Sequence, residues 1–173
     1  YAGVERIAVN THHLREQVAA CVAESEYADS VTLFDEPEIL GTGGPLVNAK
    51  ELLADCDCFL LHNCDAVNDF DLRRMIREHL ESGADVTMAM VDGPENRVFV
   101  KDGAIRAIGN RPEGNTDGMT PMTYACVSLY SPRFFEFLPD RPCNCSIVDA
   151  WVKAIEAGCK LSAFFPDSGY LWW

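Results

Sequence analysis

The sequence predicts an α/β fold with three layers, in which helices cover both faces of a mixed, mostly parallel sheet. Short apolar segments alternate with amphipathic ones through residues 7–91, in the order strand, helix, strand, helix, strand, helix, strand. This alternation is typical of right-handed strand-helix-strand units around a parallel sheet. The chain has 173 residues and 48% hydrophobic content, so we expect residues 1–173 to form a single domain with one core.

The first strand-helix-strand unit has a clear periodicity. Residues 7–9 predict a short strand, and Asn10 or Thr11 can cap the helix that follows. The apolar residues of one helix face recur at helical spacing: Leu14, Val18, Cys21 and Val22. Residues 31–34 predict the second strand. The two histidines at residues 12–13 are adjacent, so they cannot share a helix face and chelate one metal ion.

A glycine-rich segment at residues 40–44 follows the second strand. Its three glycines allow positive φ and close backbone approach, and Pro45 suits the first position of a helix over residues 45–53. Backbone N–H groups at such a helix start suit a nucleotide or another anion. A plain tight turn explains the glycines equally well, because the segment has neither Walker A spacing nor the Gly-x-Gly-x-x-Gly fingerprint.

A short apolar strand at residues 59–61 stops at a cluster of carboxylates. Asp65 falls just past its carboxyl end, where ligands bind in open α/β sheets. The carboxylate is a candidate ligand for Mg²⁺, which takes oxygen donors and keeps waters and substrate phosphates in its shell. Alternatively, Asp65, Asp69 and Asp71 are loop and N-cap residues of the next helix.

The second half of the chain departs from the alternation. The helix that ends at Gly83 is expected to bury four residues: Leu72, Met75, Ile76 and Leu80. An interior strand follows at residues 86–91, and Asp102 with Gly103 predicts a hairpin turn between two further strands. The remaining elements are a polar loop, a strand, a short helix, a longer helix and a last strand: residues 109–121, 122–130, 134–138, 146–157 and 161–165.

Charge and cysteine spacing exclude several classes of protein. The 14 basic and 27 acidic residues give a formal net charge of −13, which argues against binding to nucleic acid or an anionic membrane. A phosphate ligand would therefore need a metal ion to offset its charge. Without a membrane-spanning run or a signal-peptide pattern, we expect a cytoplasmic protein. The eight cysteines lack zinc-ribbon spacing, and we expect most to be reduced.

Taken together, these segments resemble the sugar-1-phosphate nucleotidyltransferase family over essentially the whole chain. The segments that carry the resemblance are residues 9–14, Glu36 with residues 40–44, residues 59–65, the hairpin of residues 98–108, and residues 123–132. The resemblance implies a Rossmann-like mixed sheet. It also implies an enzyme that uses Mg²⁺ to transfer a nucleotidyl group from an NTP to a sugar 1-phosphate, giving an NDP-sugar and pyrophosphate.

The resemblance further implies roles for individual residues. Asp65 corresponds to the first of two magnesium-binding aspartates and is the catalytic candidate. The implied nucleotide-binding residues are Glu36, Leu40, Gly41, Thr42, Gly43 and Gly44. The implied sugar-phosphate residues are Asn110, Arg111 and Cys126.

The chain also departs from the family pattern. Asn110 and Arg111 replace a Glu-Lys pair, Cys126 replaces a glycine that faces the sugar, and Cys64 replaces the glycine before the aspartate. The family's glycine-rich amino-terminal signature would precede the first residue, and its second metal-binding aspartate would follow the last. We therefore expect the sequence to be truncated at both ends.

Two other classes of function stay open. A non-catalytic sugar-nucleotide sensor would keep the base loop and lose the phosphate chemistry, which the departures at Asn110 and Cys126 favour slightly. A glycosyltransferase of related fold would use an Asp-x-Asp metal motif at a strand end. Asp69 and Asp71 have that spacing, but they lie several residues past the strand and suit helix capping better.

Overall fold

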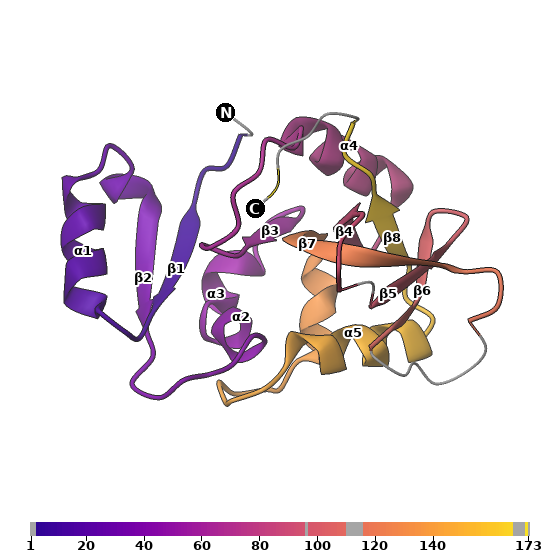
Figure 1. The fold of residues 1–173 in the computed structure, drawn as a ribbon. Coiled ribbons are helices and arrows are strands. Elements are labelled where there is room, and N and C mark those ends of the chain that lie inside the picture. The colour runs from indigo at the N-terminus through magenta and orange to yellow at the C-terminus, as the bar shows by residue number, and fades with distance from the viewer. Residues whose placement is uncertain (1–2, 96, 110–115, 168–171, 173) are drawn as a thin grey trace.

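The computed structural model describes residues 3–95, 97–109, 116–167 and 172 (Figure 1). Its elements are β1 (Ile7–Thr11), α1 (Arg15–Glu24), the 3₁₀ helix η1 (Ala28–Ser30), β2 (Val31–Asp35), α2 (Gly44–Asn48), α3 (Lys50–Leu53), β3 (Phe59–His62), α4 (Leu72–Ser82), β4 (Val86–Val91), β5 (Val98–Lys101), β6 (Ala104–Ile108), β7 (Thr120–Tyr130), the 3₁₀ helix η2 (Pro132–Phe137), α5 (Ile147–Glu156) and β8 (Leu161–Phe164). Most strands and helices expected from the sequence are present, with ends shifted by a few residues, but the helix expected over residues 45–53 is divided at Ala49 into α2 and α3, and the one expected over residues 134–138 is the 3₁₀ helix η2.

The strands form two sheets. β1 and β2 pair in parallel as a two-stranded sheet, with α1 beside it (Figure 1). The other six strands form one mixed sheet in the order β3-β7-β4-β8-β6-β5. In this sheet β4 and β8 are parallel, whereas β7 is antiparallel to β3, β4 and β5. β6 is antiparallel to both β5 and β8.

The expectation of a mostly parallel sheet is wrong for these described strands. β3 and β4 do run in the same direction, as the crossover through α4 requires, but β7 lies between them and is antiparallel to both. A strand-helix-strand pattern sets the relative direction of successive strands and not which strands become neighbours. The pattern therefore could not reveal a strand inserted from much later in the chain.

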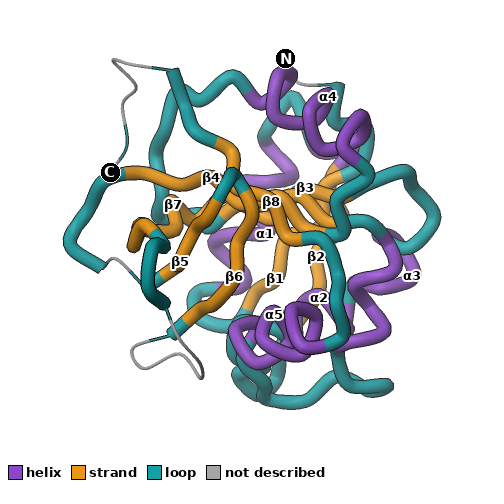
Figure 2. Tube along the Cα trace, turned by 90° about the vertical axis from the view of Figure 1, so that its right-hand side faces the viewer, coloured by secondary structure: helices purple, strands orange, loops and turns teal. Residues whose placement is uncertain are grey.

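Apolar clusters cover both faces of the six-stranded sheet. Helices α2 and α5 lie on one face and α4 on the other (Figure 2). Trp151 of α5 belongs to the first cluster and Met75 of α4 to the second. Along β4, Met88 and Met90 join the first cluster and Ala89 joins the second. This two-sided covering explains why every residue of β4 is buried.

A buried hydrogen-bond network ties α5 to the sheet. The Tyr130 hydroxyl accepts hydrogen bonds from Ser128 Oγ at 2.8 Å and from Trp151 Nε1 at 3.1 Å. The Tyr124 hydroxyl lies 2.7 Å from Ser128 Oγ. Burial raises the pKa of both tyrosines, so each stays neutral and keeps its hydrogen available for the network.

Helix α1 differs from its expected form at both its start and its buried face. It begins at Arg15, after Leu14 in the left-handed region at φ 54°, and has no side-chain cap. Capping by Asn10 or Thr11 is therefore wrong. No residue of α1 is buried, and Leu14 is 52% exposed. Among the described residues, no helix combines the length and the apolar character needed to cross a membrane.

Helix α4 has the ends that the sequence predicts. The Asp71 side chain accepts a hydrogen bond from Arg74 N at 3.0 Å, and Gly83 follows the helix at φ 61°. Its buried face is different, because Leu80 is 49% exposed and His79 is buried. His79 Nδ1 lies 2.8 Å from Thr87 Oγ1, which satisfies one ring nitrogen inside the core.

Candidate functional site

Asp65 lies just past the carboxyl end of β3, where the sequence placed it. Asn63 still bonds to β7, because its N donates to Cys126 O at 3.1 Å; the chain then turns, and Ala66 N donates to Asn63 O at 3.2 Å. This turn leaves Asp65 exposed. An exposed carboxylate at a strand end is open to a ligand outside the sheet.

An irregularity in β7 lies at Cys126, whose backbone oxygen accepts a hydrogen bond from Asn63, two residues before Asp65. Residues 125–127 of β7 stand opposite the single residue Ala89 of β4, and Cys126 takes the left-handed conformation at φ 62°. Burial raises the pKa of the Cys126 thiol, and the nearby Asp65 carboxylate raises it further. The thiol is therefore neutral at pH 7. The structure thus places two of the predicted site residues at one edge of the sheet.

We expect Cys126→Gly to stabilise the fold. A left-handed L-residue costs about 1–2 kcal/mol, whereas the extra chain entropy of glycine costs about 0.5–1 kcal/mol. The net gain in the free energy of unfolding should be roughly 0.5–1 kcal/mol, measurable by urea unfolding. Cys126→Ala is the matched control, because alanine keeps the strained conformation and should bring no gain. A loss of stability in the glycine variant would contradict this account.

The Asp65 carboxylate suits a hard cation whose other ligands are waters and substrate phosphate oxygens. Within the described ranges, no group of three or more His, Cys, Asp and Glu side chains could hold a metal ion. Mg²⁺ commonly binds one or two carboxylates together with waters and substrate phosphates. Asp65 offers one such carboxylate. The neutral Cys126 thiol is too soft a donor for this cation.

The glycine-rich loop is held by the segment that precedes α5. Cys145 O accepts hydrogen bonds from Thr42 N at 3.1 Å and from Gly43 N at 2.9 Å. In return, Cys145 N donates to Leu40 O at 3.1 Å. The Thr42 hydroxyl oxygen also accepts from Ile147 N at 3.0 Å. Residues 143–147 therefore fix the conformation of the loop over its whole length.

The loop needs glycines because its backbone lies very close to residues 143–147. A Cβ on Gly41 would lie 2.6 Å from Cys145 O, and one on Gly44 would overlap Cys143 O. The expectation of free anion-binding N–H groups is wrong for this loop, because the N–H groups of Thr42 and Gly43 donate to Cys145 O. The N–H group of Gly44 donates to Leu40 O at 3.3 Å. These three N–H groups are therefore not available to a bound anion.

Glu36 orders the start of the same loop. Its side chain is buried, and Oε2 accepts from Leu40 N at 3.1 Å. Its backbone N donates to Thr11 O at 2.7 Å, and its backbone O accepts from His12 Nδ1 at 2.6 Å. Oε1 is buried and has no hydrogen-bond partner in the described part of the chain. Glu36 and His12 therefore position the loop, a role for His12 that sequence reasoning missed.

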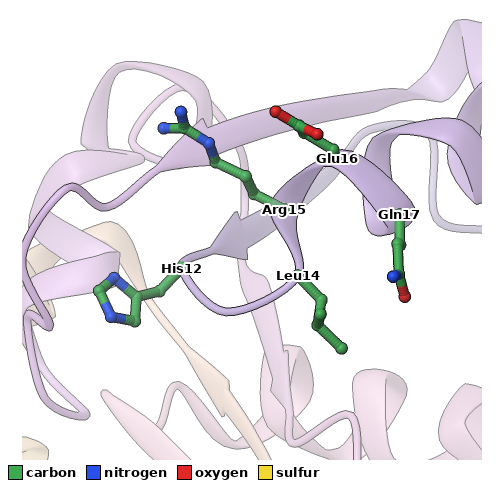
Figure 3. A pocket seen from close by; sticks show the side chains of 5 residues that line it. All are labelled: His12, Leu14, Arg15, Glu16 and Gln17. Carbon is green, nitrogen blue, oxygen red and sulfur yellow. The ribbon is translucent and has the colours of Figure 1, made fainter.

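Two pockets lie beside α1 rather than at Asp65. One has a volume of about 210 Å³ and is lined by His12, Leu14, Arg15, Glu16 and Gln17. Figure 3 shows that these side chains point in different directions instead of converging on one position. The other, of about 370 Å³, also includes Arg15 and Glu16. The first pocket lacks the convergent polar groups of a ligand site, and in the second Arg15 and Asp35 already pair with each other at 2.9 Å.

One part of the predicted site lies outside the described residues, and the sequence analysis missed another part. Asn110 and Arg111 lie outside the described residues. The sequence analysis assigned no role to residues 143–145 and so missed the segment that holds the glycine-rich loop. The paired cysteines of that segment, Cys143 and Cys145, were a signal in the sequence, but nothing local tied them to a loop about a hundred residues earlier.

Comparison with known protein families identifies one match. The profile described as nucleotidyl transferase matches residues 1–113. This range includes Asp65, Glu36 and the glycine-rich loop. It also includes both strands of the parallel two-stranded sheet.

Two curated relatives illustrate the similarity in sequence. A mannose-1-phosphate guanylyltransferase catalytic subunit beta from Danio rerio is 30% identical over 177 residues, which is 97% of this chain and 49% of that protein. A D-glycero-alpha-D-manno-heptose 1-phosphate guanylyltransferase from Aneurinibacillus thermoaerophilus is 26% identical over 145 residues, which is 78% of this chain and 63% of that protein. The chain therefore spans less than two thirds of the length of these relatives.

Solved structures share the fold. HddC from Yersinia pseudotuberculosis, solved in complex with GMP-PN, matches with a TM-score of 0.74 and 19% identity over 98% of this chain and 73% of that chain. The inositol-1-phosphate CTP transferase from T. maritima matches with a TM-score of 0.71 and 15% identity over 98% of this chain and 69% of that chain.

Proposed function

This chain belongs to the nucleotidyl transferase family, and we propose that the protein transfers a nucleotidyl group from an NTP to a sugar 1-phosphate, giving an NDP-sugar and pyrophosphate. The observation that carries the proposal is the exposed position of Asp65 at the carboxyl end of β3, two residues past the hydrogen bond from Asn63 N to Cys126 O. Relatives named as guanylyltransferases of mannose and heptose 1-phosphates support GTP and an aldose 1-phosphate as the substrates.

The reaction requires positioning and charge neutralisation more than a covalent protein group. A phosphate oxygen of the sugar phosphate attacks the α-phosphorus, and pyrophosphate leaves in line with the attack. Both substrates are anionic, and the protein itself carries a net charge of −13. Bound Mg²⁺ would supply the neutralising charge as a Lewis acid. Asp65 is the residue that would hold it.

The remaining parts of the proposal concern individual residues and the setting of the protein. We assign Asn110 and Arg111 to the sugar phosphate, because a guanidinium matches phosphate oxygens in charge and geometry. Cys126 would face the sugar. The Rossmann-like three-layer arrangement and a cytoplasmic location also belong to the proposal. Helices on both faces of the six-stranded sheet support the first of these.

Pyrophosphate release tests the function directly. The protein is incubated with Mg²⁺, mannose 1-phosphate and each of the four common NTPs in turn, and pyrophosphate is measured. We expect release with GTP that depends on both the sugar phosphate and Mg²⁺. Binding of GDP-mannose without Mg²⁺ and without any turnover would instead support the sensor, and release with no sugar phosphate present would contradict nucleotidyl transfer.

Glu36→Ala should weaken nucleotide binding and leave the maximal rate nearly unchanged. The substitution removes the acceptor of Leu40 N, so the start of the glycine-rich loop loses one hydrogen bond to a charged group. A bond of this kind contributes about 1.5 kcal/mol, so KM for the NTP should rise roughly tenfold. Glu36→Gln keeps an acceptor oxygen and should restore most of the affinity. Equal defects in both variants would argue against a positioning role.

A further inference from the structure

The segment of residues 63–68, here called the Asp65 loop, is held to the sheet at its start. β3 ends at His62, and Asn63 N donates to Cys126 O of β7 at 3.1 Å. Ala66 N then donates back to Asn63 O at 3.2 Å. Ala66 is buried, whereas Asp65 inside the turn is exposed. The backbone of the loop therefore decides where the Asp65 carboxylate points.

A hydrogen bond between two side chains closes this loop at its other end. His62 Nε2 lies 2.9 Å from Asn68 Nδ2, so the last residue of β3 is joined to the last residue of the loop. Asn68 is fixed in turn, because its Oδ1 accepts from Phe70 N at 3.3 Å and its backbone pairs with Trp172 in an isolated bridge. Trp172 Nε1 donates to Ala125 O of β7 at 3.1 Å. Both ends of the loop are therefore anchored on the six-stranded sheet.

The hydrogen bonds of His62 define what its ring can do. Nδ1 lies 2.8 Å from Asn63 O, and a carbonyl oxygen only accepts, so Nδ1 carries the hydrogen. Nε2 accepts from the Asn68 amide nitrogen, because the amide oxygen already accepts from Phe70 N. Both ring nitrogens of the neutral imidazole are therefore bonded. The ring is not available as a metal ligand or a general base, and its chemistry suits it to hold the loop.

We propose that His62 and Asn68 are positioning residues, whose hydrogen bond holds the Asp65 loop in the conformation that presents the carboxylate to Mg²⁺. A loop that is ordered in advance loses less conformational freedom when the cation binds, so its affinity for the cation is higher. Loss of one hydrogen bond between uncharged groups should weaken this affinity roughly fivefold. The link to Mg²⁺ rests on the proposed function, whereas the closure of the loop does not.

Amide hydrogen exchange tests the closure of the loop without any ligand. His62→Leu should speed exchange at Ala66 roughly fivefold and leave exchange at Asn63 unchanged, because the acceptor of Asn63 N lies on β7. His62→Gln should restore slow exchange, since its amide oxygen can replace Nε2 as the acceptor of Asn68 Nδ2. His62→Asn is too short to reach and should exchange like His62→Leu. His13→Leu is the matched control, because it removes another exposed histidine, from the turn before α1.

Activation by Mg²⁺ tests the effect on the candidate site. At saturating GTP and mannose 1-phosphate, the Mg²⁺ concentration that gives half-maximal pyrophosphate release should rise roughly fivefold in His62→Leu. The maximal rate at high Mg²⁺ should stay nearly unchanged, whereas a general loss of structure would lower it. Asn68→Ala should have at least as large an effect, because it also removes the acceptor of Phe70 N. The double variant should be no worse than Asn68→Ala alone, because the shared bond is already lost.

The two readouts separate failure of the inference from failure of the function. Unchanged exchange at Ala66 in His62→Leu, or equally fast exchange in His62→Gln, would overturn the closure of the loop. An unchanged Mg²⁺ requirement in a variant with faster exchange would overturn the link to the cation. If the unsubstituted protein releases no pyrophosphate, the proposed function fails, and the exchange measurement still decides whether His62 and Asn68 hold the loop.

Discussion

Asp65→Ala is expected to lower pyrophosphate release by at least about 100-fold, since stabilisation of transition-state charge by a bound cation is worth several kcal/mol. Asp65 is the exposed carboxylate at the carboxyl end of β3, and the neighbouring Cys126 thiol offers no charge to replace it. Steady-state assays at saturating and limiting Mg²⁺ check the prediction. The defect should persist at saturating NTP, because the group acts on the reacting phosphates.

Matched variants separate the role of Asp65 from the effect of charge alone. Asp65→Asn keeps the shape of the side chain and removes its charge, so it should show nearly the same loss. Asp29→Ala removes another exposed carboxylate, from η1, and should leave the rate unchanged. Unaltered pyrophosphate release by Asp65→Ala would exclude Asp65 as the metal ligand. If a high Mg²⁺ concentration alone restored the rate of Asp65→Ala, the role of Asp65 would be to raise the affinity for the cation.

Features that depend on neighbouring residues in the chain were predictable from the sequence. The Asp102-Gly103 turn has both residues at positive φ, 51° and 73°, as this two-residue hairpin requires. The ends of α4 follow from the capping chemistry of Asp71 and Gly83. The resemblance to sugar-1-phosphate nucleotidyltransferases rests on many such short segments in the right order. The match to the nucleotidyl transferase profile confirms it.

Features that depend on distant parts of the chain were not predictable in this way. The insertion of β7 between β3 and β4 changes the character of the sheet without changing the periodicity of any strand. The glycines of residues 41–44 illustrate the same limit in the candidate site. Their sequence is compatible with a phosphate loop, and only the approach of residues 143–147 shows that the backbone N–H groups are already bonded. The position of Asp65 depends only on where β3 ends, so that position could be predicted from the sequence.

Gly44→Ala tests this packing, because helix propensity and overpacking predict opposite changes in the free energy of unfolding. Gly44 is the first residue of α2. Helix propensity alone would make the substitution stabilising by up to about 1 kcal/mol. The structure predicts the reverse, because the new methyl group would overlap the carbonyl oxygen of Cys143, a backbone atom that cannot move without breaking the bonds of Cys145. Overpacking of this kind costs about 1–3 kcal/mol.

We therefore expect Gly44→Ala to lower the free energy of unfolding by about 1–3 kcal/mol and to weaken nucleotide binding in parallel. Urea unfolding and calorimetric titration measure the two effects. Gly83→Ala is the control, because Gly83 has φ 61° with no atom near its missing Cβ. It should lose only the cost of a left-handed residue, offset by the chain entropy that glycine no longer costs, a net of roughly 0.5–1 kcal/mol, with nucleotide affinity intact. A stabilised Gly44→Ala protein would mean that residues 143–147 do not hold the loop as closely as the hydrogen bonds of Cys145 require.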